Sequence, residues 1–537
     1  MSLANLFKFT PPGKAYNFDI ENAPKPPDEM EYIDVSHNIG DNKDFINKKL
    51  HYKTSYDITL KEFEISIGKN REKAAIYFVD GLVSTPVVDL NILEPLMVES
   101  DKLKEQSVDN VINTLVTHNQ VKMTEKMKDV LDEICYGSCA LFIDGFNKCI
   151  LMQVIGWEKR GVEGPKTEMA IFGPQQALNE SIKANTSTIR KMLRSDNLVI
   201  ENLLIGEIGK TNCAVLYLSN IANPSLVHEV KKRIKSIKVD YIMTTSELEQ
   251  FIEERSMVSL PQVLSTERPD RCVRALMAGK VVVMMDNAPL ALIMPTTLFE
   301  LLESAEDSYL RVPYSLLVKV VRLMGVIFSV FLPGFYIATI LFHTYILPTG
   351  MLTTIMSASK NVPFNSVIEL ILMVLSFEVI REASVRVPGF LGSTLGIIGP
   401  LVLGQAAISA NLISPMMIIV FSIATIGSFA TPNYSIAFSA RVLNLLFITL
   451  GVMGGYLGLA AGIFTEVIIW NTTKSFGVFM LSPFAPKLNM MPESIKTEPI
   501  WKKEFRPRHL KSMRPYTQAH ISRGWIMEDE FEENKDD

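Results

Sequence analysis

One apolar stretch, residues 364–386, carries charged side chains that could bind or conduct an ion. They are Glu369, Glu378, Arg381, Glu382 and Arg386. In a helix, Glu378, Glu382 and Arg386 share one face because they are four residues apart, and Arg381 reaches Glu378. Glu369 lies about half a turn away and faces elsewhere. The charges form either a polar lining for an ion or solute path, or ion pairs that anchor a helix at the membrane interface.

A second pattern consists of small residues spaced for close helix packing. Glycines recur at every fourth position in two series, which are Gly451 and Gly455, and Gly454, Gly458 and Gly462. This spacing lets helix backbones approach each other in a membrane. The segment Gly404–Ala407 has the same small residues with one polar side chain, Gln405, which either bonds another helix or faces a pore. We favour helix packing for this whole pattern.

No catalytic or metal-binding pattern is evident. The sequence lacks a phosphate-binding loop, a nucleophile elbow, a zinc-protease motif and a dinucleotide fingerprint in strand–turn–helix context. An odd number of cysteines without a neighbouring His or Cys pair indicates buried, reduced thiols at Cys135, Cys139, Cys149, Cys213 and Cys272. We therefore expect neither an enzyme nor a cofactor or metal.

The chain that holds these residues divides sharply in composition. Mean hydropathy is +0.20 although 21% of residues are charged. From Gly389 to Trp470 the only charged residues are Arg441 and Glu466. This predicts a soluble α/β N-terminal domain followed by an α-helical transmembrane domain over residues 311–475, in contact with membrane lipid. The net charge of -5 gives no reason to expect a nucleic-acid partner.

The membrane topology depends on residues 364–386. Four other segments are apolar and long enough to be candidate spans, namely Leu323–Phe342, Leu395–Leu412, Met416–Ala430 and Leu443–Trp470. We prefer four crossings, with residues 364–386 re-entrant or interfacial, and five crossings stay open. The tail, residues 476–537, is basic and then acidic, which favours the cytoplasm under the positive-inside rule. The N-terminus lacks an export signal, so the soluble domain is expected there too.

Within the soluble part, the sequence predicts a flexible extension over residues 1–54 and two α/β sub-domains, 55–195 and 196–310. Strands end in turns at Asp80-Gly81, Asp144-Gly145 and Asp286-Asn287. Helices are expected from Ala177 to Leu193 and after Asn223-Pro224. Near the end of this part, Glu267, Arg268 and Asp270 are interpreted as a structural latch, with Asp270 capping a helix that runs to Ala278.

Several phrases together resemble the A subunit of the nutrient germinant receptors of endospore-forming bacteria. In chain order they are FVDG at 78–81, LFIDG at 141–145, PKTE at 165–168, Gly173-Pro174, TERPDR at 266–271, FEVIREA at 377–383, GPLVLGQAA at 399–407, SFG at 475–477 and LSPFAP at 481–486. Each phrase is weak, but their order over residues 60–490 is specific. This chain departs from the family at Phe172, where members often have Arg, and at residues 175–178.

The resemblance implies a receptor complex in the spore inner membrane, with a permease-like B subunit and a lipoprotein C subunit. It implies that small nutrients, bound by this chain or through the B subunit, trigger germination and ion release. We add the expectation of a homo-oligomer whose polar helix faces line an ion pore. Two alternatives stay open: a transporter working by alternating access, and a scaffold anchored in the membrane. The sequence has no internal repeat of its membrane part, which disfavours the transporter.

Overall fold

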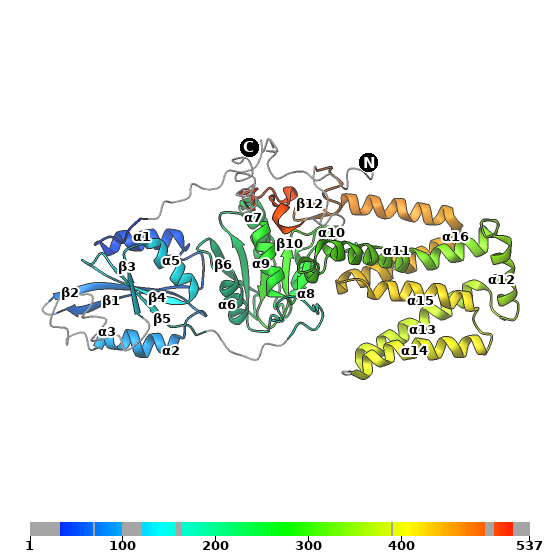
Figure 1. Cartoon of the computed structure of the whole chain (residues 1–537), viewed down its shortest axis with the longest axis horizontal. Coiled ribbons are helices and arrows are strands. Elements are labelled where there is room, and N and C mark those ends of the chain that lie inside the picture. The colour runs from blue at the N-terminus through cyan, green and yellow to red at the C-terminus, as the bar shows by residue number, and fades with distance from the viewer. Residues whose placement is uncertain are drawn as a thin grey trace, which may run out of the picture.

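The computed structural model describes residues 33–67, 70–98, 121–156, 164–256, 258–387, 390–488 and 499–518. Three parts follow one another along the long axis of the molecule, and Figure 1 shows them as two sheet domains and a bundle of helices. The α/β domain with two sub-domains, followed by a helical part, confirms the predicted fold class.

The first sheet domain is a five-stranded antiparallel sheet in the order β1-β2-β4-β5-β3. Alternate side chains of β2 point to opposite faces, as strand geometry requires. Tyr77 packs against the helices on one face and Ile76 against those on the other. The strands are β1 (Ile58–Ile67), β2 (Asn70–Val79), β3 (Val121–Thr124), β4 (Ser138–Ile143) and β5 (Cys149–Gln153), and the helices are α1 (Ile39–Lys49) and α5 (Met127–Tyr136) on one face and α2 (Thr85–Val88), η2 (Asp89–Leu93) and α3 (Glu94–Val98) on the other.

Part of the predicted N-terminal extension belongs to this domain. Helix α1 lies within residues 1–54, and its Phe45 and Ile46 are buried in the core beside β2 and β4. The side chain of Asn38 caps the helix, and the Asp144 carboxylate accepts the Ile39 N–H at 3.1 Å. The predicted flexible extension over residues 1–54 is therefore too long. The apolar stripe of α1 is short and few apolar residues precede it, so the sequence gives only a weak signal for this helix. Residues 1–32 lie outside the described residues.

The second sheet domain repeats this plan strand for strand, in the order β6-β7-β9-β10-β8. Helices α6 and α9 cover one face, and α7 and α8 the other. The predicted turn at Asp286-Asn287 and the helix after Asn223 are confirmed. The elements are α6 (Ile182–Met192), β6 (Leu198–Ile205), β7 (Thr211–Leu218), α7 (Pro224–Lys235), α8 (Thr245–Ile252), β8 (Leu264–Thr266), α9 (Pro269–Ala278), β9 (Val281–Met285), β10 (Ala291–Met294), α10 (Leu298–Leu301) and η4 (Ala305–Ser308).

Local contacts also repeat between the two domains. The Asn42 side chain on α1 accepts the Ser36 N–H and donates to the Ser36 carbonyl, and we call this pair of hydrogen bonds an asparagine bracket. The Asn185 side chain on α6 forms the same bracket with the N–H and carbonyl of Asn179. The Asp286 carboxylate accepts the Ile182 N–H at 3.1 Å, just as the Asp144 carboxylate accepts the Ile39 N–H in the first domain. Because α6 plays the part of α1, packing divides the two domains before α6, whereas the sequence suggested a boundary at 195/196.

The helical part begins with a long helix that runs through Pro333. Among the described residues, α11 and α16 are long and apolar enough to span a membrane, and α15 and the second half of α14 are shorter apolar helices. α11 packs against α15 and α16, and α13 packs against α14. The elements are α11 (Val312–Phe342), η5 (Thr344–Ile346), α12 (Thr349–Ser359), α13 (Ser366–Arg386), α14 (Phe390–Ser409), α15 (Pro415–Phe429) and α16 (Tyr434–Thr472).

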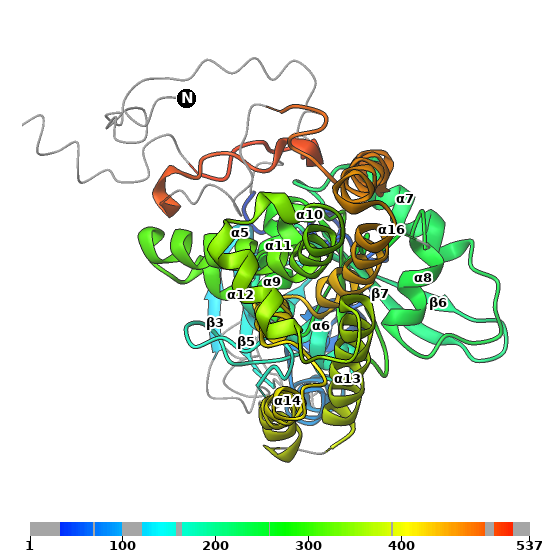
Figure 2. The same cartoon turned by 90° about the vertical axis from the view of Figure 1, so that its right-hand side faces the viewer.

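Helix α16 reverses direction at Gly455. Its backbone there is φ 56° and ψ -139°, which is not helical and favours glycine. A Cβ at Gly458 would overlap the carbonyl of Leu450, so the two legs of α16, 434–454 and 456–472, lie antiparallel. Figures 1 and 2 show them side by side. The second leg therefore carries the chain back towards the sheet domains.

After α16 the chain enters the second sheet domain. The hairpin of β11 (Lys474–Ser475) and β12 (Val478–Phe479) buries Phe476 in one core of that domain, and Met480 in the other. Ser475 Oγ donates to Gln262 O at 2.6 Å and accepts the Thr296 N–H at 3.0 Å. The short helices η6 (Ile500–Lys502) and η7 (Arg508–Leu510) follow, and Arg506 Nε donates to Met277 O on α9. Part of the tail is thus packed against the soluble domain.

Candidate functional site

The charged residues of α13 fall into two sets. On the outer face, Arg381 Nη1 lies 3.2 Å from Glu378 Oε1, and Arg386 Nη2 lies 2.6 Å from Glu382 Oε1. The side chains of Glu378, Glu382 and Arg386 are 47%, 66% and 77% exposed. Glu378, Glu382 and Arg386 point away from the rest of the chain, in a bundle whose other exposed side chains are mostly apolar. The Arg381 side chain is only 16% exposed and lies over the Phe429 ring of α15.

Glu369 forms the second set and is buried. It is 1% exposed, and its Oε2 accepts the backbone N–H of Ser414 at 2.8 Å. Ser414 precedes α15, so the carboxylate meets the positive end of that helix. Glu369 thereby ties α13 to α15.

Gln405 lies on α14 with its side chain exposed, on the same hairpin as the outer charges of α13. It makes no hydrogen bond that would fix it within this chain, as far as the described residues show. Its outward position suits a contact or a path formed between molecules.

Four of the five glycines lie at close contacts, which are with backbone atoms at Gly451 and Gly458 and with side chains at Gly455 and Gly462. A Cβ on Gly451 would lie 2.6 Å from the carbonyl oxygen of Gly334 on α11, and Gly455 is the point of reversal. Gly458 and Gly462 face the first leg of α16, and a Cβ on Gly462 would lie 3.0 Å from the Phe447 ring. A Cβ on Gly454 would meet open space. The two glycine series therefore serve different contacts.

The cluster of Glu267, Arg268 and Asp270 binds the segment 166–174 to the start of α9. The buried Arg268 donates to both carboxylate oxygens of Asp270 at 3.0 Å and to the carbonyls of Glu168 and Pro174. Glu267 accepts the Lys166 N–H at 2.7 Å. The prediction that Asp270 caps α9 is wrong. Pro269 places Asp270 in the first turn of the helix, where it pairs with Arg268 and accepts a hydrogen bond from the Tyr309 hydroxyl. Burial, with a smaller effect from Asp270, raises the pKa of Tyr309.

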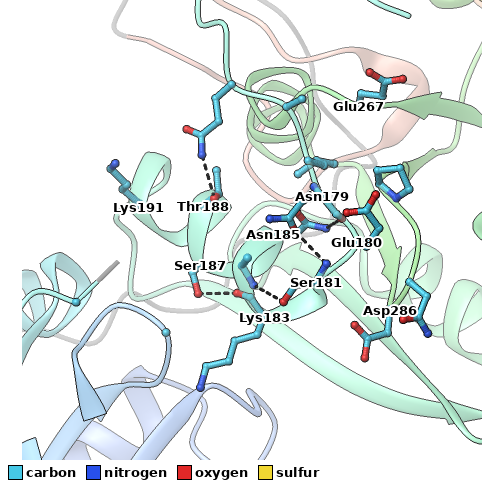
Figure 3. A pocket seen from close by; sticks show the side chains of 18 of the residues that line it. Asn179, Glu180, Ser181, Lys183, Asn185, Ser187, Thr188, Lys191, Glu267 and Asp286 are labelled. Atoms are coloured by element: carbon cyan, nitrogen blue, oxygen red, sulfur yellow. Dashed lines mark hydrogen bonds between the residues drawn. The ribbon is translucent and has the colours of Figure 1, made fainter. Parts of the chain in front are cut away.

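A cavity of about 940 Å³ lies between the two sheet domains. Its wall carries side chains of both signs of charge. They include the carboxylates of Glu180, Glu267 and Asp286 and the ammonium groups of Lys183 and Lys191. Figure 3 shows Lys183 extending from α6 towards the first sheet domain, where it pairs with Asp80 at 2.8 Å. Sequence reasoning missed this cavity, because its lining comes from loops and helix starts far apart in the chain.

Two further contacts link the second sheet domain to the membrane helices. The guanidinium of Arg322 on α11 bonds both oxygens of the buried Asp307 carboxylate, at 2.6 and 3.0 Å, and Leu302 O at 3.0 Å. The β11–β12 hairpin holds the end of α16. Both ends of the helical part are therefore fixed in the same domain.

All five cysteines are buried and unpaired. Burial raises the pKa of the Cys135 and Cys213 thiols to about 12, so they stay protonated and unreactive. Among the residues that the structure describes, no group of His, Cys, Asp and Glu side chains could hold a metal ion.

A family model described as the Bacillus/Clostridium GerA spore germination protein matches residues 44–509. The chain belongs to this family. It is 30% identical over 497 residues to spore germination protein KA of Bacillus subtilis (strain 168), covering 91% of each chain, and 30% identical over 461 residues to spore germination protein GerLA of Bacillus cereus, covering 86% of this chain and 92% of that one. Spore germination protein B1 of Bacillus subtilis (strain 168) is 34% identical over 385 residues, covering 71% and 79%.

Among solved structures, the chain is similar to the N-terminal domain of the A subunit of the Bacillus megaterium spore germinant receptor GerK3. The identity is 25%, the match covers 49% of this chain and 97% of that one, and the TM-score is 0.37. The GerA family membership confirms the resemblance found in the sequence.

Proposed function

We propose that this GerA-family chain is the membrane-embedded signalling subunit of a nutrient germinant receptor, in which several copies surround an ion path. The outer charges of α13 carry the proposal. Placing a charged side chain in contact with hydrocarbon is costly, at roughly 2.5–3.5 kcal/mol each on insertion scales. Glu378, Glu382 and Arg386 avoid this cost if they face water between neighbouring copies.

The proposed topology has six crossings in place of the four or five expected from the sequence, because Gly455 divides α16 into two legs and α13 is a full helix. Among the described residues, six helical legs run along the bundle, namely α11, α13, α14, α15 and both legs of α16. Helix α13 has 21 residues, and at 1.5 Å each it is about 31 Å long, enough for a hydrocarbon core. An even number places the sheet domains and the tail on one side, in keeping with the packing of β11–β12 into the second sheet domain. We place that side in the cytoplasm and the helices in the spore inner membrane.

The cavity between the sheet domains is the proposed ligand site on this chain. Its acidic and basic side chains suit a small ligand that carries both charges, as free amino acids do. Ligand binding shifts a conformational equilibrium only if it favours one arrangement of the two domains. The second domain would transmit that change to α11 and α16 through Arg322 and the β11–β12 hairpin, and onward to α13 through Glu369.

The test is nutrient-dependent ion flux. The full chain is reconstituted with its B and C subunits in liposomes loaded with K⁺, and efflux is measured after adding a mixture of amino acids. We expect Glu378→Gln and Glu382→Gln to change the efflux rate by about tenfold, the lower end of the effect that a cleft lined by one sign of charge has on local ion concentration and on-rates. Lys360→Gln is the matched control, because Lys360 is exposed beyond α12 and off the charged face.

Three results would contradict the proposal. An absence of nutrient-dependent efflux from liposomes that hold the wild-type proteins would rule out the pore. Equal efflux in wild type, Glu378→Gln and Glu382→Gln would favour a membrane-anchored scaffold, which tolerates neutral substitutions there. Uptake of labelled amino acid in step with ion flux would favour the transporter.

A further inference from the structure

The reversal of α16 leaves a backbone N–H without a partner in its own helix, at the end of the bundle away from the sheet domains. Residues in the first turn of a helix have N–H groups without a partner in that helix. Tyr456 is the first residue after Gly455, so its N–H is such a group at the start of the second leg. In a membrane this group needs an acceptor from elsewhere.

The acceptor is the ring of His343, the residue that ends α11. Tyr456 N–H donates to His343 Nε2 at 3.4 Å, and the two rings stack with centroids 4.4 Å apart and planes 11° apart. Tyr456 is also held to α11 by its hydroxyl, 2.7 Å from Thr339 Oγ1. His343 Nδ1 lies 3.1 Å from the hydroxyl of Tyr345. One imidazole thus joins α11, η5 and the second leg of α16.

This arrangement fixes the tautomer of the neutral ring. An Nε2 that accepts a hydrogen bond carries no proton, so the neutral ring has its proton on Nδ1 and donates it to Tyr345. Protonation of Nε2 would place two N–H groups against each other. It would also set a positive charge at the positive end of the second leg.

We propose that His343 is a proton-sensitive cap that holds the reversal of α16 closed and releases it when the ring is protonated from the side of the membrane away from the sheet domains. The groups that face the ring are Tyr345 from η5, Tyr456 from α16 and Phe342 from α11. All are uncharged, so within the described residues no carboxylate offsets the new charge.

Release would act on the link between membrane and soluble domain. The first leg of α16 stays against α11 through Gly334 and Gly451, whereas the second leg continues into β11 and the core of the second sheet domain. A loosened second leg weakens that connection. Acidification on the far side would therefore regulate the chain independently of any ligand in the cavity, and whether or not the chain forms a pore.

Hydrogen exchange at the reversal tests the proposal. The full chain in lipid nanodiscs is exchanged at pH 8 and pH 5.5, and protection of the segment 455–460 is measured by mass spectrometry, each rate being divided by the intrinsic rate at that pH. Loss of one hydrogen bond corresponds to about a three- to tenfold fall in protection at the lower pH. His343→Gln keeps a neutral acceptor that does not titrate, so its protection should not change with pH.

Tyr345→Phe is the matched control, since it leaves Nε2 and Tyr456 untouched and should keep the pH dependence. The proposal fails if wild-type protection is the same at both pH values. It also fails if His343→Gln shows the same fall as wild type. If His343→Gln does not assemble, the wild type and Tyr345→Phe still decide, because both must lose protection between pH 8 and pH 5.5.

Discussion

The two sheet domains have the same strand order, the same asparagine bracket and the same aspartate turn, but they are joined to the molecule in different ways. The first contacts the second through the buried pair of Arg190 and Asp57 and through hydrogen bonds such as that from the Tyr56 N–H to Ile200 O at 2.9 Å. The second receives both ends of the membrane part, at Arg322 and at the β11–β12 hairpin. The second domain is therefore fixed to both ends of the helical part, whereas the first is joined to the molecule through its contacts with the second.

The largest effect is expected at the joint between the domains. Arg190 is buried, and its guanidinium bonds both oxygens of Asp57 at 3.0 Å. Asp57→Ala leaves this charge without its carboxylate, which should destabilise the protein by about 3–5 kcal/mol. The measurement is denaturant or thermal unfolding of the full chain in detergent.

Asp80→Asn is the control for that variant. Asp80 pairs with Lys183 across the same two domains, but both side chains are more than a third exposed, so its loss should cost less than about 1 kcal/mol. Equal losses in the two variants would show that the buried pair does not hold the domains together.

The next effect is expected at the joint with the membrane. Arg322→Ala leaves the buried Asp307 carboxylate unpaired, at a cost of about 3 kcal/mol, because this pair lies nearer to solvent than that of Arg190. Proteolytic cleavage between the second sheet domain and α11 should become faster, in proportion to the larger population of molecules in which this joint is open. Arg311→Ala, at an exposed position just before α11, should leave the rate unchanged. Faster cleavage in both variants would mean that α11 is held by something other than Arg322.

The repeated asparagines provide a matched pair of substitutions. Asn42→Ala and Asn185→Ala each remove two hydrogen bonds from a buried bracket, so each should cost about 2 kcal/mol. Only Asn185→Ala should also increase hydrogen exchange in the β11–β12 hairpin, since α6 and Met480 share one core. Increased exchange there in Asn42→Ala would contradict the separation of the two domains.

Sequence reasoning succeeded where the signal is local. The turn at Asp286-Asn287, the helix capped by Asn223 and the apolar helices follow from residue types within a few positions. It failed where contacts connect distant residues. The cavity, the bond from Ser414 to Glu369 and the reversal at Gly455 depend on neighbours brought together by packing. The repeated plan of the two sheet domains was missed because it lies in the order in which the strands pair.

The smallest effect concerns pH and is confined to the second sheet domain. Burial, and to a lesser degree the nearby Glu253, raises the pKa of Glu249 on α8 from 4.5 to about 7. The folded state therefore binds this proton more tightly than the unfolded state. Its stabilising contribution is complete below pH 4.5 and is lost as pH rises through about 7. Glu249→Gln, which is neutral throughout, should stabilise the protein by about 1–2 kcal/mol at pH 8 and leave it nearly unchanged at pH 4.5. Unfolding of the full chain at both pH values measures this, and a loss of stability at pH 8 would show that the Glu249 carboxylate is favourably paired in the folded protein.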